Sequence, residues 1–570
     1  MGMNLKKNIA GNYTLPLLFL ALVAVNIFAL QFHARIDFTN EKRFTLSKAS
    51  TRLLQKVKEP IVVDVFLKGN YPSGFKRLAT STTDLLQEFK EVAGANLTFS
   101  LISPTETMPE TSMAYSDTLA GLGLIPINLT SQVQEGQQQQ LVYPYALVHY
   151  QNKTIPVTLY QGKTPLINFQ ELSSAEATLE YKLASAISQA MQTEKPIIGY
   201  ANGNGEPTDI RTYDLVQNTL VPNYQLFTID INTQPVVPPE FNVLLMVKPT
   251  KPFTEDAKFK LDQYVMNGGK LLFFIDRLEA ELDSLQKGEV VAYDRDLKLN
   301  DLFFKYGARI NGDLLMDLQC DYLPFDVNGN GQFELLPWNY FPVLETQANH
   351  SITKNVGFVA ARFINSIDTV EAVGIKKTVL LHSSANARTI ATPALISGKE
   401  NETSPQSEKY TRANIPVALL LEGKFTSLFA NRLSSRMSDS LAKYDATFLP
   451  RNTTDTKIII AADGDMVLNS VVRGAEPIPM GMNAYTYGSQ RQFPFANKDF
   501  LQNCLDYLVN QNDLSEAKAK DYVVRLLDTK KVAEQKTFWQ LINIVVPAFI
   551  ILIFGVGFQW WRKHKYGRKG

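Results

Sequence analysis

Two strongly apolar segments, one near each end of the chain, enclose a body of mixed polar and apolar positions. The first segment covers residues 15–30 and follows two lysines, and the second covers residues 538–561 and precedes five basic residues. A helix needs about 20 mostly apolar residues to cross ~30 Å of hydrocarbon, and both segments approach that length. Tryptophans stand at both ends of the second segment, as is typical of a membrane interface. The pattern predicts one transmembrane helix at each end, over residues 13–32 and 538–561.

The basic residues after the second segment predict its orientation. Lysine and arginine beside a span are retained in the cytoplasm, so the C-terminus is expected there. Two spans then place both termini in the cytoplasm and the body in the periplasm, and the chain in the inner membrane. A cleaved signal peptide is the alternative for the first segment. Residues 32–34 (Phe-His-Ala) make a poor small-x-small cleavage site, which favours a retained anchor.

The body begins with the pattern of a β-α-β unit. An apolar run at residues 61–66 predicts a buried strand, and apolar positions at helical spacing over 75–92 predict an amphipathic helix. Gly94 is expected to end that helix, and residues 97–102 to form the next strand. This order is typical of a small α/β domain.

The next stretch predicts a β-hairpin followed by a helix. Residues 141–150 and 154–160 have the composition of paired strands, and the glutamine run at 137–140 before them is typical of a solvated loop. Ser173 with Glu176 three residues later forms a capping-box pattern, so a helix is expected to begin there. We place a domain boundary after that helix, near residue 195.

Strand and helix patterns then alternate, which predicts a mostly parallel sheet with helices on both faces. The expected strands are residues 197–201, 225–231, 242–247, 270–276 and 457–462, and the expected helices are 254–266 and 497–508. Between about residues 307 and 456 the pattern breaks into short β-like runs, which we interpret as an insertion.

The predicted fold class is therefore α/β, with a membrane helix at each end. The domains are an N-terminal anchor (1–36), a small α/β domain (37–192), a parallel-sheet domain (193–510) with a β-rich insertion (about 307–456), a juxtamembrane segment (511–537) and a C-terminal helix with a basic tail (538–570). A formal net charge of +1 gives no indication of a nucleic-acid partner. The two cysteines, Cys320 and Cys504, allow one disulfide but no cysteine-based metal site.

The sequence has few of the residues that catalysis needs. It contains no GxSxG, HExxH or GxxxxGK[ST] motif. Two of its five histidines flank the predicted spans, and the other three, His149, His350 and His382, are far apart. We therefore predict that the protein is not an enzyme and has no cofactor.

One loop stands where ligands usually bind. Residues 203–206 (Gly-Asn-Gly-Glu) follow the strand at 197–201, at the carboxyl end of the predicted parallel sheet. Asn202, Asn204 and Glu206 are the candidate ligand-binding residues. A tight loop that needs glycine is the alternative, and Thr208 replaces the third glycine of a dinucleotide fingerprint.

Two acidic motifs are candidates for cation binding. Residues 326–331 (Asp-Val-Asn-Gly-Asn-Gly) match the start of a calcium loop, but Pro337 stands where the bidentate glutamate is needed, so a polar turn is favoured. Asp463 and Asp465 follow the strand at 457–462, yet ordinary turn chemistry explains them equally well. No partner ligand can be named for either motif.

Several segments resemble a known family. Residues 36–47 (Ile-Asp-Phe-Thr-Asn-Glu-Lys-Arg-Phe-Thr-Leu-Ser) are similar to an entry motif of the auxiliary components of ABC transporters. Residues 258–270, 306–311, 317–320, 422–429 and 495–500 are similar to the gliding-motility branch of that family, found in the Bacteroidetes. The resemblance extends over nearly the whole chain.

The resemblance implies a non-catalytic subunit that accompanies a multi-span permease and a separate ATPase. It also implies a central domain of glutamine-amidotransferase-like or flavodoxin-like fold without the nucleophilic cysteine. The wider family often has Gly-His-Gly-Glu where this chain has Gly-Asn-Gly-Glu at 203–206. Other periplasmic or envelope proteins are further candidate partners. The alternatives are a solute-binding component with its pocket near Asn202–Glu206, and a membrane-bound hydrolase, which the missing nucleophile disfavours.

Overall fold

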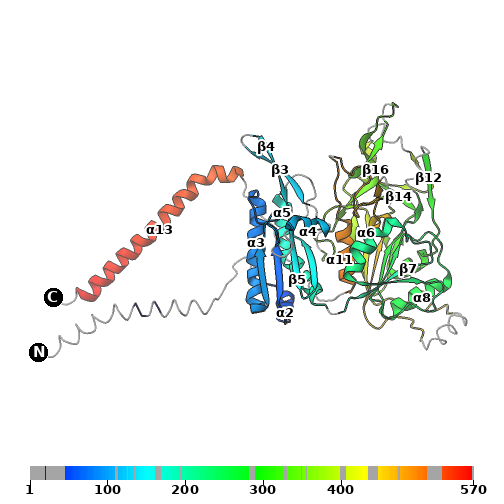
Figure 1. Ribbon diagram of the computed structural model, residues 1–570, viewed down its shortest axis with the longest axis horizontal. Helices are drawn as coiled ribbons and strands as arrows, with labels where there is room; N and C mark the ends of the chain where they lie inside the picture. Colours follow the sequence, from blue (N-terminus) through cyan, green and yellow to red (C-terminus); the bar gives the residue numbers. More distant parts are fainter. Residues whose placement is uncertain are drawn as a thin grey trace. The chain divides into compact units, whose positions relative to one another are not determined.

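The computed structural model divides the chain into two compact units, Met1–Tyr522 and Val523–Gly570, which are described separately (Figure 1). The described residues are 19–20, 23, 45–108, 113–122, 124, 126–133, 136–160, 169–192, 194–280, 289–326, 330–347, 350–354, 356–397, 406–433, 447–472, 476–489, 491–509 and 529–567. Nearly all of the predicted first span, 13–32, lies outside them.

The first α/β layer confirms the predicted β-α-β unit. Strand β1 (Ile61–Val65) is followed by helix α3 (Ser73–Ala93) and strand β2 (Leu97–Leu101), and the two strands pair in parallel. Gly94 ends α3 with a φ of 67°, a conformation that glycine adopts without strain. Phe75, Leu78 and Phe89 of α3 are fully buried against this sheet, so the apolar stripe of the sequence is the packed face.

The hairpin that follows has shorter strands than predicted, and a separate two-stranded ribbon precedes it. Strands β5 (Tyr145–Tyr150) and β6 (Lys153–Thr158) complete a sheet of order β2-β1-β5-β6. The glutamine run at 137–140 is not a loop: it lies in β4 (Gly136–Val142), which pairs with β3 (Ile127–Val133). A two-stranded ribbon satisfies its backbone groups through the ladder, so polar side chains do not prevent strand formation.

Helix α5 (Phe169–Met191) begins before the predicted capping box. Ser173 therefore lies inside the helix, where its hydroxyl accepts a hydrogen bond from Arg77 Nη2 of α3 at 3.2 Å. Arg77 also contacts Glu176 at 2.6 Å, so both residues of the expected capping box bind the neighbouring helix. Figure 1 shows α3 and α5 near the same strands, and the two helices are in contact. The remaining helices of this part are α2 (Lys48–Leu54) and α4 (Tyr115–Gly121).

The central sheet contains the predicted parallel strands. Its strand order is β15-β16-β19-β22-β23-β10-β9-β7-β8, with β17 paired to β16. The parallel half comprises β7 (Ile197–Asn202), β8 (Gln225–Asp230), β9 (Val243–Val247), β10 (Leu271–Phe274) and β23 (Thr456–Ala461). Every residue of β9 and β10 is buried, as expected for strands covered on both faces.

The rest of the sheet corrects the prediction of a mostly parallel arrangement. Residues from the expected insertion form antiparallel strands that extend the same sheet beyond β23: β15 (Cys320–Phe325), β16 (Glu334–Thr346), β17 (Val359–Ala360), β19 (Ile375–His382) and β22 (Pro416–Gly423). The sheet is mixed because β22 runs opposite to β23. The apolar residues of β22, Val417–Leu421, are fully buried in the same core as those of β23.

Short strands and helices surround the sheet. The strands are β11 (Leu278–Glu279), β12 (Glu289–Asp294), β13 (Ala308–Ile310), β14 (Asp313–Asp317), β18 (Ile367–Thr369), β20 (Ala387–Ala391), β21 (Ala394–Ser397), β24 (Val471–Val472) and β25 (Glu476–Pro477). The helices are α6 (Tyr213–Leu215), α7 (Val221–Asn223), α8 (Glu255–Met266), α9 (Asn300–Tyr306) and α11 (Asn497–Val509). Helices α8 and α11 confirm the predicted ones. Both cysteines are free thiols, and Cys504 is buried in α11.

The second unit contains helix α13 (Thr529–Tyr566). Within the described residues, its segment Gln535–His564 is the one stretch of helix long and apolar enough to cross a membrane. Its apolar side chains are exposed, as the 72% exposure of Ile551 illustrates. The predicted C-terminal apolar helix is therefore present, and by length and composition it is a candidate membrane span.

Candidate functional site

Three adjacent strands of the parallel half end in charged residues. Strand β9 leads into Lys248, β10 leads to Asp276, and β23 leads to Asp463 and Asp465. The strands are neighbours in the order β23-β10-β9 and run in parallel, so their carboxyl ends meet at one edge of the sheet. This edge is where ligands usually bind in open α/β sheets.

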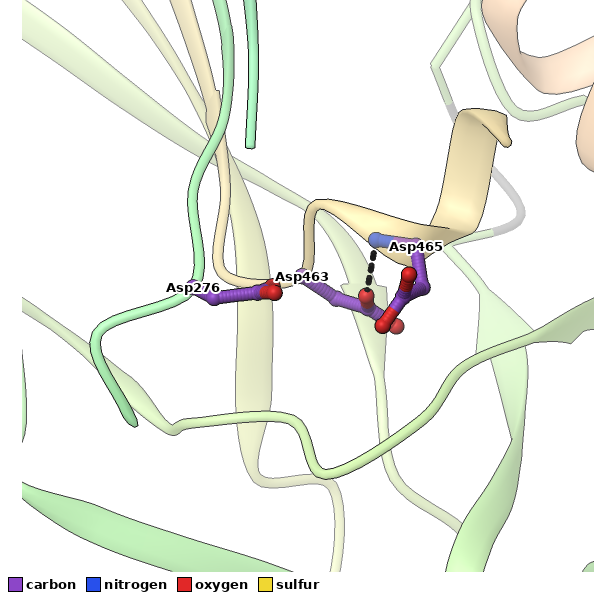
Figure 2. Close-up of side chains that lie close together, drawn as sticks. All are labelled: Asp276, Asp463 and Asp465. Carbon is purple, nitrogen blue, oxygen red and sulfur yellow. Dashed lines mark hydrogen bonds between the residues drawn. The ribbon is translucent and has the colours of Figure 1, made fainter. Parts of the chain in front are cut away.

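The three aspartates form one cluster, which is drawn in Figure 2. Carboxylate oxygens of Asp276, Asp463 and Asp465 lie within 4.8 Å of one another. Asp463 is completely buried. Its Oδ1 accepts a hydrogen bond from the backbone N of Asp465 at 2.7 Å, and its Oδ2 accepts one from the backbone N of Arg362 at 2.7 Å.

The ammonium group of Lys248 is the counter-charge of this cluster. Its Nζ lies 2.7 Å from both carboxylate oxygens of Asp465 and 3.2 Å from Oδ2 of Asp276. Lys248 is 3% exposed and has a φ of 46°, an uncommon conformation for a residue with a Cβ. Such backbone strain persists only where surrounding contacts impose it, and it is most frequent at functional sites.

Burial and neighbouring charges shift the pKa values of the three carboxyl groups in different directions. Burial and the two neighbouring carboxylates raise the pKa of Asp463 well above its usual range, so the charged form of this carboxyl is disfavoured. Burial also raises the pKa of Asp276, although Lys248 opposes that shift. Burial would raise the pKa of Asp465 too, but Lys248 and Arg362 outweigh it and lower the value. Lys248 and Asp465 therefore form an ion pair at this edge of the sheet, beside a buried Asp463 whose charged form is disfavoured.

This arrangement is better suited to an internal ion pair than to the binding of a metal ion. Three carboxylates are a set that divalent cations accept. The Lys248 ammonium, however, already contacts two of the three, which places a positive charge where a cation would be attracted. A small pocket of about 20 Å³, room for one water molecule, adjoins Asp465 and is also lined by Arg362 and Asn483.

The glycine loop after β7 folds tightly on itself. Asn204 is 2% exposed; its Oδ1 accepts from Asn232 Nδ2 at 3.2 Å, and its Nδ2 donates to the Pro252 carbonyl at 3.2 Å. Gly205 has a φ of 82°, and a Cβ there would lie 2.1 Å from Thr250 Oγ1. The loop therefore requires glycine, and Asn204 fastens it to neighbouring segments. Asn202, the last residue of β7, is exposed.

Glu206 differs from the other residues of this loop. It is 6% exposed, and its Oε2 accepts a hydrogen bond from the backbone N of Asn204 at 2.8 Å. Its Oε1 is buried and has no hydrogen-bond partner among the described residues. Burial raises the pKa of Glu206 to about 7. A buried carboxyl oxygen without a partner is costly, which marks this position for a bound proton or ligand.

The other candidates do not join these groups. Asp326 accepts hydrogen bonds from the backbone N of Asn330 at 3.1 Å and of Gly331 at 2.9 Å, the bonding of a polar turn, while residues 327–329 lie outside the described range. The histidines are separate: His149 contacts Asp64, His350 contacts Tyr507, and His382 contacts the Ser383 carbonyl.

Sequence reasoning identified Asp463 and Asp465 but no partner for them. The structure adds Lys248 and Asp276. Lys248 follows strand β9 directly, and Asp276 follows β10 after one further apolar residue, at the same edge of the sheet as Asp463. That shared position is the signal that was available in the sequence, because carboxyl ends of parallel strands meet.

The fold and this sheet edge can now be set beside known proteins. A family model described as "ABC-type uncharacterized transport system" matches residues 195–504, which include the whole parallel half of the sheet and the charged cluster. The chain belongs to this family of ABC-type transport system proteins. A second model, for a domain of unknown function, matches residues 40–149.

Individual relatives of this ABC-type transport family member are remote. An uncharacterized protein of Borreliella burgdorferi is 20% identical over 565 residues, which is 97% of each chain. Among solved structures, the mmIFT52 N-terminal domain is 11% identical and covers 55% of this chain and 96% of its own, with a TM-score of 0.29. An exo-beta-1,4-mannosidase from Opitutaceae bacterium strain TAV5 has a TM-score of 0.17. Scores this low assign no fold.

Proposed function

We propose that the chain is a non-catalytic subunit of an ABC-type membrane complex associated with gliding motility, with its α/β body outside the cytoplasm. The observation that carries the proposal is helix α13, an exposed apolar helix in a member of an ABC-type transport family. The sequence of this chain has no P-loop motif, so ATP hydrolysis is assigned to a separate subunit.

In this proposal the membrane helices dock against a multi-span permease. Gly555 and Gly557 lie in the apolar part of α13, and small residues let helices approach closely in a membrane. Movement of the permease, driven by the ATPase, is transmitted to the body. The body either carries that movement outward or presents a surface to other envelope proteins.

Protease accessibility tests the orientation. With a tag after Gly570, added protease is expected to cut the body in spheroplasts and the tag only in inverted inner-membrane vesicles. Basic residues retained in the cytoplasm are the physical reason. A body that is cut only in inverted vesicles would reverse the proposed orientation.

An assay of the purified chain tests the non-catalytic role. Alone in detergent, it is expected to hydrolyse no ATP above the level of a mock purification. Turnover that remains with the chain through repeated purification, and falls when Lys248 or Asp463 is replaced, would show that the chain is itself an ATPase.

A solute-binding component is the second candidate, and Glu206 is the observation that favours it. The buried Oε1 of Glu206 has no hydrogen-bond partner in the described part of the chain, and the loop stands at the carboxyl edge of the sheet. A ligand at 100 times its dissociation constant adds ~2.7 kcal/mol to stability, so a metabolite panel in a thermal-shift assay is the test. A ligand that stabilises the wild type but not Glu206→Gln would favour solute binding over the structural role.

A further inference from the structure

A pocket of about 490 Å³ opens at the opposite edge of the central sheet from the aspartate cluster. It lies where β22 ends at Gly423 and β23 begins at Thr456, two residues that pair with each other. Strand β23 has six residues, and at about 3.3 Å per residue it separates this pocket from Asp463 by about 20 Å. The pocket is therefore distinct from the candidate site described above.

The lining of this pocket is predominantly basic. Four cationic side chains, Lys376, Lys424, Arg451 and Lys457, face two acidic ones, Glu422 and Asp455. Glu422 is already engaged: it accepts a hydrogen bond from the Tyr507 hydroxyl at 2.5 Å, and Lys376 Nζ lies 3.8 Å from its Oε2. The formal charge of the lining is thus positive by two.

Two of the cations form no direct ion pair within the described part of the chain. Among the described residues, neither Lys424 nor Arg451 forms an ion pair or a side-chain hydrogen bond, and both are exposed to the pocket's solvent. Lys457 lies with its Nζ 3.8 Å from the ring centroid of Tyr507, a cation–π contact that fixes it along one wall. Burial lowers the pKa of nearby Lys270, and the positive charge of Lys457 adds to that shift.

The volume and the placement of the charges indicate the kind of ligand. A pocket of this size matches sites for small molecules. The cations come from three separate segments, the start of β19, the end of β22 and the approach to β23, and converge on one space. Positive charges that converge on one space suit a compact anion, whereas an extended acidic peptide would require a row of positive charges. The Arg451 fork and the lysine point charges are suited to phosphate oxygens.

We propose that this pocket binds a small anion through its phosphate groups. The proposal is independent of the function assigned to the membrane helices. The same chemistry is offered by a soluble phosphorylated metabolite and by a lipid phosphate.

Calorimetric titration of the full chain in detergent with inorganic pyrophosphate tests the proposal. One pyrophosphate is expected to bind per chain at low salt, and the double variant Lys424→Gln/Arg451→Gln is expected to bind at least about tenfold more weakly. The matched control is Lys58→Gln/Lys90→Gln, which removes two exposed positive charges from the N-terminal domain and is expected to leave the affinity unchanged. Absence of binding to the wild type, or equal weakening in both variants, would overturn the proposal.

Competition distinguishes the ligand classes. Displacement of pyrophosphate by phosphatidic acid in mixed micelles supports the proposal and identifies a lipid source, and displacement only by soluble phosphates supports it with a metabolite source. If a hexaglutamate peptide binds in a way that depends on Lys424 and Arg451 while pyrophosphate does not, the pocket is a docking site for an acidic protein segment and the phosphate assignment is wrong.

Discussion

At the scale of single residues, Lys248 holds the carboxyl edge of the sheet together. It is buried, its Nζ contacts Asp276 and Asp465, and its backbone has a positive φ. Buried ion pairs add little net stability compared with apolar packing, but breaking one leaves an unpaired charge inside the protein. The effect of substitution at this position is therefore large even if the pair itself contributes little.

Lys248→Met is expected to lower the free energy of unfolding by about 3 kcal/mol, because Asp276 and Asp465 lose the ammonium group that contacts both. The midpoint of thermal unfolding in detergent measures the effect. Lys305→Met, at an exposed position of α9, is the control and is expected to change the free energy by less than about 0.5 kcal/mol. Equal midpoints for the two variants would contradict a cluster centred on Lys248.

Glu206 predicts a pH dependence with a definite sign. Burial raises its folded pKa from the ordinary 4.5 to about 7, so the folded state binds the proton more tightly than the unfolded state. Stability from this group is complete below pH 4.5 and is lost as the pH rises through 7, a difference of about 3 kcal/mol. Glu206→Gln is expected to remove this dependence.

The measurement is unfolding of the wild type and Glu206→Gln at about pH 5 and about pH 8, with the difference between the two proteins compared across pH. Glu59→Gln, at an exposed position, is the control for removing a carboxylate. If the difference between wild type and Glu206→Gln is the same at both pH values, the carboxyl titrates in its ordinary range.

The sequence was sufficient to identify some residues of these sites, but not the contacts between their side chains. Asp463 and Glu206 were visible because each follows a predicted strand at the carboxyl edge. The unpartnered Oε1 of Glu206 and the contact between Lys248 and Asp465, separated by 217 residues, depend on tertiary packing that no local pattern contains.

At the scale of elements, apolar periodicity predicted helices α3, α8 and α11 and the strands of the parallel half of the central sheet. The prediction failed where backbone pairing or contacts between helices outweighed the local preference of the side chains. The glutamines of β4 were predicted as a loop because they are polar, yet backbone pairing with β3 satisfies the strand. The start of α5 was misplaced because Ser173 and Glu176, which look like a cap, instead contact Arg77 of α3.

Gly423 is a position where two antiparallel strands depend on glycine. It has a φ of 139°, and a Cβ there would lie 2.1 Å from the backbone oxygen of Gly374 beside the start of β19. Gly423→Ala is therefore expected to destabilise the protein by about 3 kcal/mol or more, because backbone must move. Gly488→Ala is the control for conformation alone, since Gly488 has a φ of 75° with nothing within 4 Å.

Thermal unfolding of the two alanine variants gives the comparison. Gly488→Ala is expected to cost about 1–2 kcal/mol from its backbone angle. If Gly423→Ala lowers the free energy of unfolding no more than Gly488→Ala does, the backbone where β19 pairs with β22 can move enough to relieve the clash.

If α13 spans the membrane, a charged residue at its centre is expected to prevent its insertion. Ile550→Lys places a cation in the middle of the apolar stretch, which costs about 3 kcal/mol of insertion free energy. The helix is then expected not to insert, so that a C-terminal tag becomes accessible to protease in spheroplasts. Gln559→Lys, close to the end of the helix, allows the lysine to reach the interface and is expected to leave the tag protected. Equal protection in both variants would argue against a span at α13.

At the scale of the whole molecule, the sequence predicted the α/β class and the C-terminal membrane helix, and it predicted a mostly parallel sheet where the structure has a mixed one. The parallel half was accessible because strands β7, β9 and β10 alternate with helices or turns at short range. The antiparallel half was not, because β16, β19 and β22 lie among many short runs. Their place in the central sheet follows from long-range pairing, in which β22 pairs with β23 and β19 with β22.

In the proposed function, this member of an ABC-type transport family, with its apolar helix α13, acts as a subunit beside a permease and an ATPase. Purification of the tagged chain from its native membranes in mild detergent, followed by mass spectrometry of the bound proteins, tests this most directly. A multi-span permease and an ATPase recovered in fixed ratio with the chain are the predicted result. Recovery of the chain alone, under conditions that keep other membrane complexes intact, would contradict its role as a subunit.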